Sequence, residues 1–130
     1  LISELGLVNQ VSPVQLAIRL LLPEGSALLD HPEMKPHLQG FVPERLSYGW
    51  HNPDRRADQL QSTVQALVET SEAQGKSRTG IFAGIWRLAH DALGIAAVPL
   101  PAETCAQDIP RMSEPWYCCA EPTEAQRAGL

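Results

Sequence analysis

Residues 52–94 read NPDRRADQLQSTVQALVETSEAQGKSRTGIFAGIWRLAHDALG, and this stretch predicts two consecutive helices. Asn52-Pro53-Asp54 is typical of a helix start, because Asn caps free N–H groups, Pro suits the first position and an acid suits the first turn. The first helix should run to about Ala73 and end at Gln74-Gly75. Its apolar residues recur on one face, at Leu60, Val64, Leu67 and Val68.

The second helix is expected from about Thr79 to Leu93, where Gly94 closes it. Its wide apolar face, which indicates burial, consists of Ile81, Phe82, Ile85, Trp86, Ala89, Ala92 and Leu93. The short link between the helices predicts a helical hairpin. His90 precedes Asp91, but neighbouring side chains on a helix diverge, so a capping or surface histidine is expected instead of a catalytic pair.

The apolar run from Val14 to Leu22, bounded by prolines, predicts a strand that is buried on both faces, as in a parallel sheet. A helix is the alternative, because Leu, Ala and Arg are good helix formers. The short length and the bounding prolines favour the strand. Residues Leu1–Gly6 have the form of the last turns of a helix that Gly6 closes.

Arg19 is the charged residue inside that run. One interpretation is a side chain that extends past the end of the sheet into solvent. The other is a guanidinium that binds a carboxylate or a phosphate through paired hydrogen bonds. Because a turn at Pro23-Glu24-Gly25-Ser26 follows, and α/β folds bind ligands where strands lead into such loops, Arg19 is a candidate cofactor-binding residue.

Residues 31–52 are expected to form an irregular connector, because three prolines, Pro32, Pro36 and Pro43, interrupt it. His31 and His37 lie there without the spacing of a metal site, so they are interpreted as exposed loop histidines, and no metal ligand is predicted in the chain. Tyr48 and Trp50 at alternate positions are consistent with a short extended piece that covers a core or lines a cleft.

The chain has 130 residues, a formal net charge of −5 and three cysteines. Its length suits one compact domain, and the absence of a Lys/Arg cluster argues against nucleic-acid binding. No apolar run approaches the roughly 20 residues of a membrane span, and the first residues do not resemble a signal peptide. Because the cysteines do not form a secreted disulfide framework, a cytoplasmic protein is expected.

Cys118 and Cys119 are adjacent, and Trp116-Tyr117 precedes them. Neighbouring Cα atoms are about 3.8 Å apart, below the roughly 4.4 Å at which disulfides usually begin. A bond between these two thiols would be strained and easily reduced, which suits a redox or attacking pair. Pairing with Cys105 and two inert, partly buried cysteines are the alternatives.

Cys118-Cys119-Ala120-Glu121-Pro122 resembles the terminal signature of radical SAM proteins with a CUAEP or CCAEP tail. The block from Val11 to Leu29 is similar to the end of the catalytic barrel in radical SAM proteins, where a helix leads into a late strand of a partial (β/α) barrel. The chain lacks the upstream CxxxCxxC loop of that family, and its own cysteine spacing cannot replace it. We therefore expect the chain to be the C-terminal portion of such an enzyme.

The resemblance implies a function and catalytic residues. In some relatives selenocysteine takes the place of Cys119, which implies a nucleophile or redox partner there, with Cys118 as the resolving thiol. Glu121 is either a hydrogen-bond acceptor or base for a nearby thiol, or a solvated side chain. The complete enzyme would cleave S-adenosylmethionine reductively at a [4Fe–4S] cluster held by a separate N-terminal radical SAM core. The segment alone would bind neither the cluster nor S-adenosylmethionine. The sequence does not indicate the substrate.

The interpretations combine into a mostly helical α/β fragment with four parts. Residues 1–30 would be the last helix–strand unit of the barrel, 31–52 the connector, 53–94 the helical hairpin, and 95–130 a Pro-rich tail with the Cys-Cys motif. The expected partners are the N-terminal core and a substrate, with neither nucleic acid nor a membrane. The alternative is a stand-alone helical domain whose Cys-Cys tail binds a partner or a soft metal.

Overall fold

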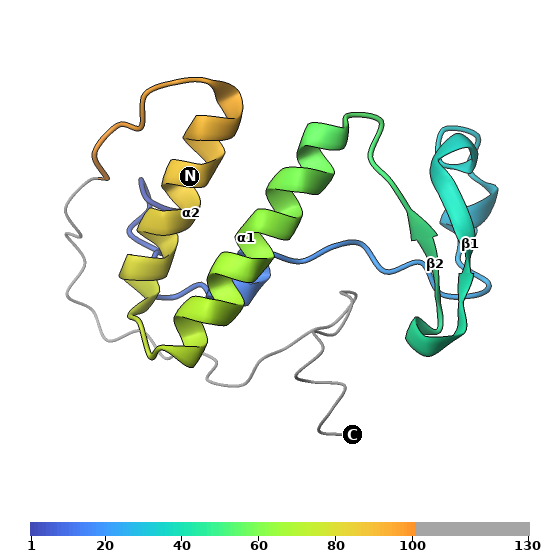
Figure 1. Cartoon of the computed structure of the whole chain (residues 1–130), viewed down its shortest axis with the longest axis horizontal. Coiled ribbons are helices and arrows are strands. Elements are labelled where there is room, and N and C mark those ends of the chain that lie inside the picture. The colour runs from blue at the N-terminus through green and yellow to red at the C-terminus, as the bar shows by residue number, and fades with distance from the viewer. Residues whose placement is uncertain (101–130) are drawn as a thin grey trace. The chain divides into compact units, whose positions relative to one another are not determined.

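The computed structural model describes residues 1–100, which form a small α/β structure (Figure 1). Its main elements are β1 (Leu38–Val42), β2 (Ser47–Trp50), α1 (Arg55–Ala73) and α2 (Arg78–Leu93). Four short 3-10 helices accompany them, at Pro13–Leu16, Ala27–Asp30, Lys35–His37 and Pro43–Arg45. The described residues divide into two compact units, one made of 1–17 and 60–100 and the other of 18–59.

The two predicted helices are confirmed, and their ends lie close to the predicted residues. Before α1, the side-chain oxygen of Asn52 accepts a hydrogen bond from the Asp54 N–H at 3.1 Å, so this segment is a turn that leads into the helix. After α1, Gly75 has φ +66°, and the Lys76 N–H donates to the Ser71 carbonyl at 3.0 Å. A left-handed glycine closes the helix there as predicted.

The ends of α2 also follow the sequence prediction. Ser77 caps its start, because its hydroxyl oxygen accepts a hydrogen bond from the Gly80 N–H at 3.2 Å. Gly94 ends it with φ +68°, and its N–H donates to the Asp91 carbonyl at 3.0 Å. Both ends of this helix are therefore determined by local residues.

The first unit has its core between the helices. Val64 and Val68 of α1 and Ile81 of α2 are 5%, 2% and 2% exposed, and Ala17 packs with them. A Cβ added at Gly84 would come within 2.8 Å of a Leu67 methyl group, so the helix backbones approach closely at that point. The predicted helical hairpin is visible as the α1–α2 pair in Figure 1.

The predicted strand at Val14–Leu22 is wrong. Pro13–Leu16 is a 3-10 helix, and Ala17 packs against α1 and α2 instead of joining a sheet. The prolines that bound the run suit a 3-10 start as well as a strand end, and the period-two pattern does not distinguish the two. Residues Leu1–Gly6 are hydrogen-bonded turns and not a helix, although Gly6 has the expected positive φ of +67°.

The expected irregular connector at 31–52 is wrong in part, because β1 and β2 form an antiparallel hairpin within it, whereas the short extended piece predicted at Tyr48 and Trp50 is confirmed as part of β2. The register pairs Leu38 with Trp50, Phe41 with Tyr48 and Val42 with Ser47. Pro36 and Pro43 fall in the 3-10 helices beside β1, so the prolines do not interrupt the ladder. No barrel is formed by residues 1–100.

The second unit has its own small buried centre. Leu22 is fully buried and Ser47 is 1% exposed. Pro23 forms an antiparallel bridge with Ser47, and the Tyr48 N–H donates to the Leu22 carbonyl at 2.8 Å. The backbone of Leu22 and Pro23 therefore lies beside β2.

Candidate functional site

The predicted catalytic pair Cys118 and Cys119 lies outside the described residues, as do Cys105 and Glu121. Their roles stay predictions from the sequence. Among the residues that the structure describes, the predicted candidate with a defined environment is Arg19.

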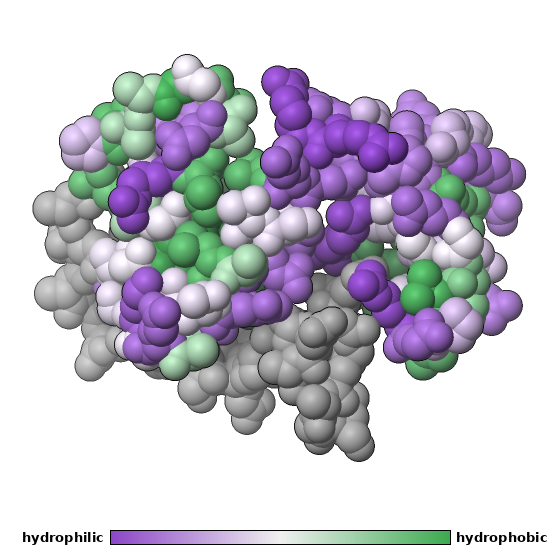
Figure 2. Space-filling view, in the orientation of Figure 1, coloured by the Kyte–Doolittle hydropathy of each residue, from purple (hydrophilic) through white to green (hydrophobic). Residues whose placement is uncertain are grey.

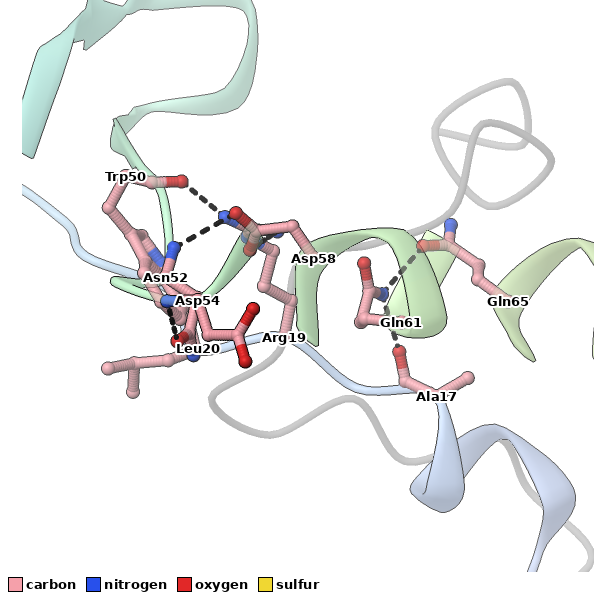
Figure 3. A network of polar contacts seen from close by, with 9 residues as sticks. All are labelled: Ala17, Arg19, Leu20, Trp50, Asn52, Asp54, Asp58, Gln61 and Gln65. Carbon is pink, nitrogen blue, oxygen red and sulfur yellow. Dashed lines mark hydrogen bonds and ion pairs between the residues drawn. The ribbon is translucent and has the colours of Figure 1, made fainter. Parts of the chain in front are cut away.

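Arg19 lies at the centre of a polar cluster in the second unit, made with Asp58, Trp50 and Asn52 (Figure 3). Its Nη1 donates to Asp58 Oδ1 at 3.1 Å, and its Nη2 donates to the Trp50 carbonyl. The guanidinium carbon also lies 4.4 Å from the centre of the Trp50 ring. The cation thus combines an ion pair with a cation–π contact.

Asp58 and Trp50 are each held by a second hydrogen bond, so the cluster is more than one ion pair. The other oxygen of Asp58 accepts the Asn52 N–H at 2.9 Å. The indole Nε1 of Trp50 donates to the Leu20 carbonyl at 2.8 Å. These contacts join the first turn of α1, the end of β2 and the backbone beside Arg19.

This geometry selects between the two interpretations of Arg19. The side chain is 20% exposed and does bind a carboxylate, but the carboxylate is Asp58 of the same chain. The interpretation of a side chain extending freely into solvent is wrong. The arrangement stabilises local structure, and binding of an external anion would have to compete with Asp58.

A second ion pair, between Arg56 and Asp54, lies at the solvent-exposed start of α1. The Arg56 Nη2 donates to Asp54 Oδ2 at 2.7 Å. The hydrogen bonds from Arg56 lower the pKa of Asp54 below its ordinary value, and the same contact raises the pKa of Arg56. Because both side chains are exposed, this pair contributes little to stability.

The first unit contains a polar contact of a different kind. The Gln61 side chain donates to the Ala17 carbonyl at 2.9 Å and to the Gln65 side chain at 3.0 Å (Figure 3). This contact satisfies the carbonyl at the end of the 3-10 helix Pro13–Leu16. It is a structural contact, and it contains neither a nucleophile nor an ionisable group.

The histidines have environments that the sequence did not reveal. His37 and His51 form an edge-to-face pair with ring centres 5.3 Å apart, whereas the sequence predicted exposure for His37. The alternation at Tyr48 and Trp50 predicted an extended piece beside His51, but it does not identify His37 as the partner of that histidine. His90 is a partly buried histidine whose Nδ1 lies 2.8 Å from the Trp86 carbonyl within α2.

Residues 1–100 contain no group of three or more His, Cys, Asp or Glu side chains placed to hold a metal ion. Among the described helices, none has the length and apolar character needed to cross a membrane. No family model, curated protein or solved structure matches the chain. Arguments about function therefore rest on the residues themselves.

Proposed function

We propose that this chain is the C-terminal part of a radical SAM enzyme and that Cys118 and Cys119 form a redox-active pair. The observation that carries the proposal is the sequence Cys118-Cys119-Ala120-Glu121-Pro122, which resembles the tail of that family. The barrel strand expected within Val11 to Leu29 is not part of this proposal, because that segment begins with a 3-10 helix and forms no strand.

Exposed apolar side chains support a role as part of a larger protein. Leu1 and Leu5 are 83% and 59% exposed, and Ile18 and Leu20 are 47% and 42% exposed. All four belong to residues 1–20. Exposed apolar side chains such as these are available to pack against another domain.

A second apolar surface lies over the C-terminal end of α2 (Figure 2). Leu93 is 72% exposed, and Ile95 and Val98 are 51% and 63% exposed. In the sequence, these residues come before the segment that carries the cysteines. It is consistent with a C-terminal part that packs against a core domain.

The chain itself does not fit the iron–sulfur cluster of the family. All three cysteines lie after residue 100, and two of them are adjacent, so they lack the spacing of a cluster site. When bound to a separate core, the cluster and S-adenosylmethionine would supply a 5′-deoxyadenosyl radical. The chemistry assigned to this chain is restricted to its thiols.

The proposed thiol chemistry is exchange with a substrate disulfide. The Cys119 thiolate attacks one sulfur of that disulfide and releases the other as a thiolate. The Cys118 thiolate then attacks the mixed disulfide and releases the second substrate thiolate. The substrate disulfide is reduced by two electrons, and the Cys118–Cys119 pair is oxidised to a strained disulfide that is easily reduced again.

Differential alkylation of the complete protein tests the cysteine assignment. The native protein is treated with iodoacetamide before and after reduction, and the labelled sites are mapped by mass spectrometry. We expect Cys118 and Cys119 to be labelled fast only after reduction, and a Cys105→Ser variant should behave identically. Absence of labelling in both states would mean inert cysteines and would refute the redox role.

A separate assay tests the enzyme class. The complete protein, purified without oxygen and reduced, should convert S-adenosylmethionine to 5′-deoxyadenosine, and this should persist in a Cys119→Ser variant. A complete reading frame without an upstream three-cysteine loop would contradict the radical SAM assignment.

The second candidate is a stand-alone helical domain whose tail binds a partner or a soft metal. The observation that favours it is the closed core of α1 and α2, in which Val68 and Ile81 are each 2% exposed. A core of this kind can be stable without another domain. If the expressed chain is a soluble, folded monomer, that result would support this candidate and would contradict the proposal that the chain is part of a larger enzyme.

A further inference from the structure

We propose that His37 and His51, with the side-chain oxygen of Gln39 on the same face of the hairpin, form a binding site for a divalent transition-metal ion of the zinc class. This site belongs to the β1–β2 hairpin and is independent of the Cys-Cys tail. It joins residues that are far apart in the sequence, because the hairpin brings the two histidines opposite each other.

The two histidines extend the β1–β2 ladder by one position. Leu38 pairs with Trp50, so His37 and His51 form the next pair, and the His51 N–H donates to the His37 carbonyl at 3.0 Å. Side chains directly opposite in an antiparallel pair point to the same face. The ring centres lie 5.3 Å apart, which is close enough for both imidazoles to contact one ion after rotation of their side chains.

One ring nitrogen lacks a partner, which is the observation that points to a ligand. His37 Nδ1 is buried and has no hydrogen-bond partner among the described residues. Buried polar atoms are nearly always satisfied, so an atom of this kind calls for a bound ion or water. Neutral imidazole nitrogen is among the preferred ligands of Zn²⁺, Cu²⁺ and Ni²⁺.

Gln39 brings an oxygen donor to the same face. Gly49 and His51 are two residues apart on β2 and its extension, so their Cβ directions point to one face. A Cβ at Gly49 would lie only 2.8 Å from Gln39 Oε1 and 3.2 Å from Gln39 Cβ. The Gln39 side chain therefore lies across Gly49 on the histidine face, in space that only glycine leaves open.

The charge of Arg19 belongs to the opposite face of the hairpin. Arg19 stacks on the ring of Trp50, which precedes His51 and therefore points away from it. Its guanidinium is also engaged with Asp58 at 3.1 Å. A cation bound by the histidines would thus be separated from the Arg19 charge by the hairpin. Two imidazoles and one amide oxygen leave room for water to complete a four-coordinate site.

The four histidines of the chain make the test specific. Zn²⁺ is added to the full chain in a Cys105→Ser, Cys118→Ser, Cys119→Ser background, which removes the competing thiols. Long-range ¹H–¹⁵N spectra of the histidine side chains then report which imidazoles bind. We expect the signals of His37 and His51 to shift and saturate at one equivalent, while those of His31 and His90 stay unchanged.

Zn²⁺ affinities of variants, measured by calorimetry, provide a second test. His51→Phe retains an aromatic ring against His37 but removes the ligand, so it should abolish Zn²⁺ binding while the circular dichroism spectrum is kept. Gln39→Ala should weaken binding about tenfold, the lower end of the effect of supporting groups at metal sites. His31→Ala is the matched control and should bind with unchanged affinity.

Several results would overturn the proposal. They are equal shifts of all four histidines, no shift of His37 and His51 at millimolar Zn²⁺, or Zn²⁺ affinity that survives in a folded His51→Phe variant. Each would mean that the pair is a packing contact.

Discussion

Replacing Arg19 by Ala should lower the free energy of unfolding of the second unit by about 2 kcal/mol. The side chain donates to the Asp58 carboxylate and to the Trp50 carbonyl, and it stacks on the Trp50 ring. A hydrogen bond to a charged group contributes about 1.5–3 kcal/mol, and a partly exposed cation–π contact about 0.5–1 kcal/mol. Because Arg19 and Asp58 are 20% and 26% exposed, solvent screening reduces the sum to about 2 kcal/mol.

A double-mutant cycle isolates the ion pair from the other contacts of Arg19. Asp58→Asn keeps an oxygen for the Asn52 N–H but removes the charge, and should cost about 1 kcal/mol. The coupling energy between the two substitutions should be about 1 kcal/mol, because the pair is in direct contact. Arg56→Ala, which breaks the exposed pair with Asp54, is the control and should leave stability unchanged within error.

Urea unfolding measured by tryptophan fluorescence gives these free energies. Trp86 and Trp116 are replaced by Phe, so that Trp50 under the guanidinium reports on the second unit alone. A coupling energy below about 0.3 kcal/mol, the usual limit for independent sites, would refute the argument that Arg19 and Asp58 act together.

Three further predictions concern a charge and two backbone positions. Partial burial raises the pKa of Glu72 while Arg78 opposes the shift, so the ionised carboxylate is disfavoured in the fold. A Glu72→Gln variant should therefore have the same free energy of unfolding as the parent well below pH 4.5. As the pH rises through and above the raised pKa, the variant should become slightly more stable than the parent, as measured by urea unfolding between pH 3 and 7. Gly94→Ala should lower the melting temperature, since a side chain at φ +68° costs about 1–2 kcal/mol; an unchanged value would contradict the left-handed cap. Leu46→Gly should raise hairpin stability by up to about 1 kcal/mol because Leu46 has φ 52° and is 73% exposed, and amide exchange in β1 and β2 should slow. Faster exchange would mean that the Leu46 side chain contributes more than its backbone strain costs.

The two α-helices could be predicted because their signals are local. Capping by Ser77 and closure by Gly75 and Gly94 depend on residues within one turn of each helix end. The four-residue spacing of Val64 and Val68 predicted the buried face of α1, since helical geometry places these residues on one stripe.

The segment from Val14 to Leu22 could not be assigned by the same reasoning. Its apolar pattern suits a strand, a helix or an irregular piece that packs on a neighbour. The conformation of this segment depends on contacts with residues that are distant in the sequence, such as the packing of Ala17 with Val68 and Ile81. Propensity is weak for so short a run, and tertiary packing overrides it.

The β1–β2 hairpin was missed because prolines were counted as interruptions of the whole segment. Pro36 and Pro43 lie in 3-10 helices at the two ends of β1, where the missing N–H disturbs no ladder bond. The bulge between Leu38 and Phe41 also masks the period-two pattern of the strand.

The sequence alone determined the helix boundaries, the buried stripe of α1 and the chemical character of the Cys118-Cys119 motif, because these depend on residues within a few positions of one another. The tertiary structure alone decided that Arg19 binds Asp58 and that His37 faces His51. The residues of the first pair are 39 positions apart and those of the second pair are 14 positions apart. Backbone pairing and packing bring them together, and no local sequence pattern encodes these contacts.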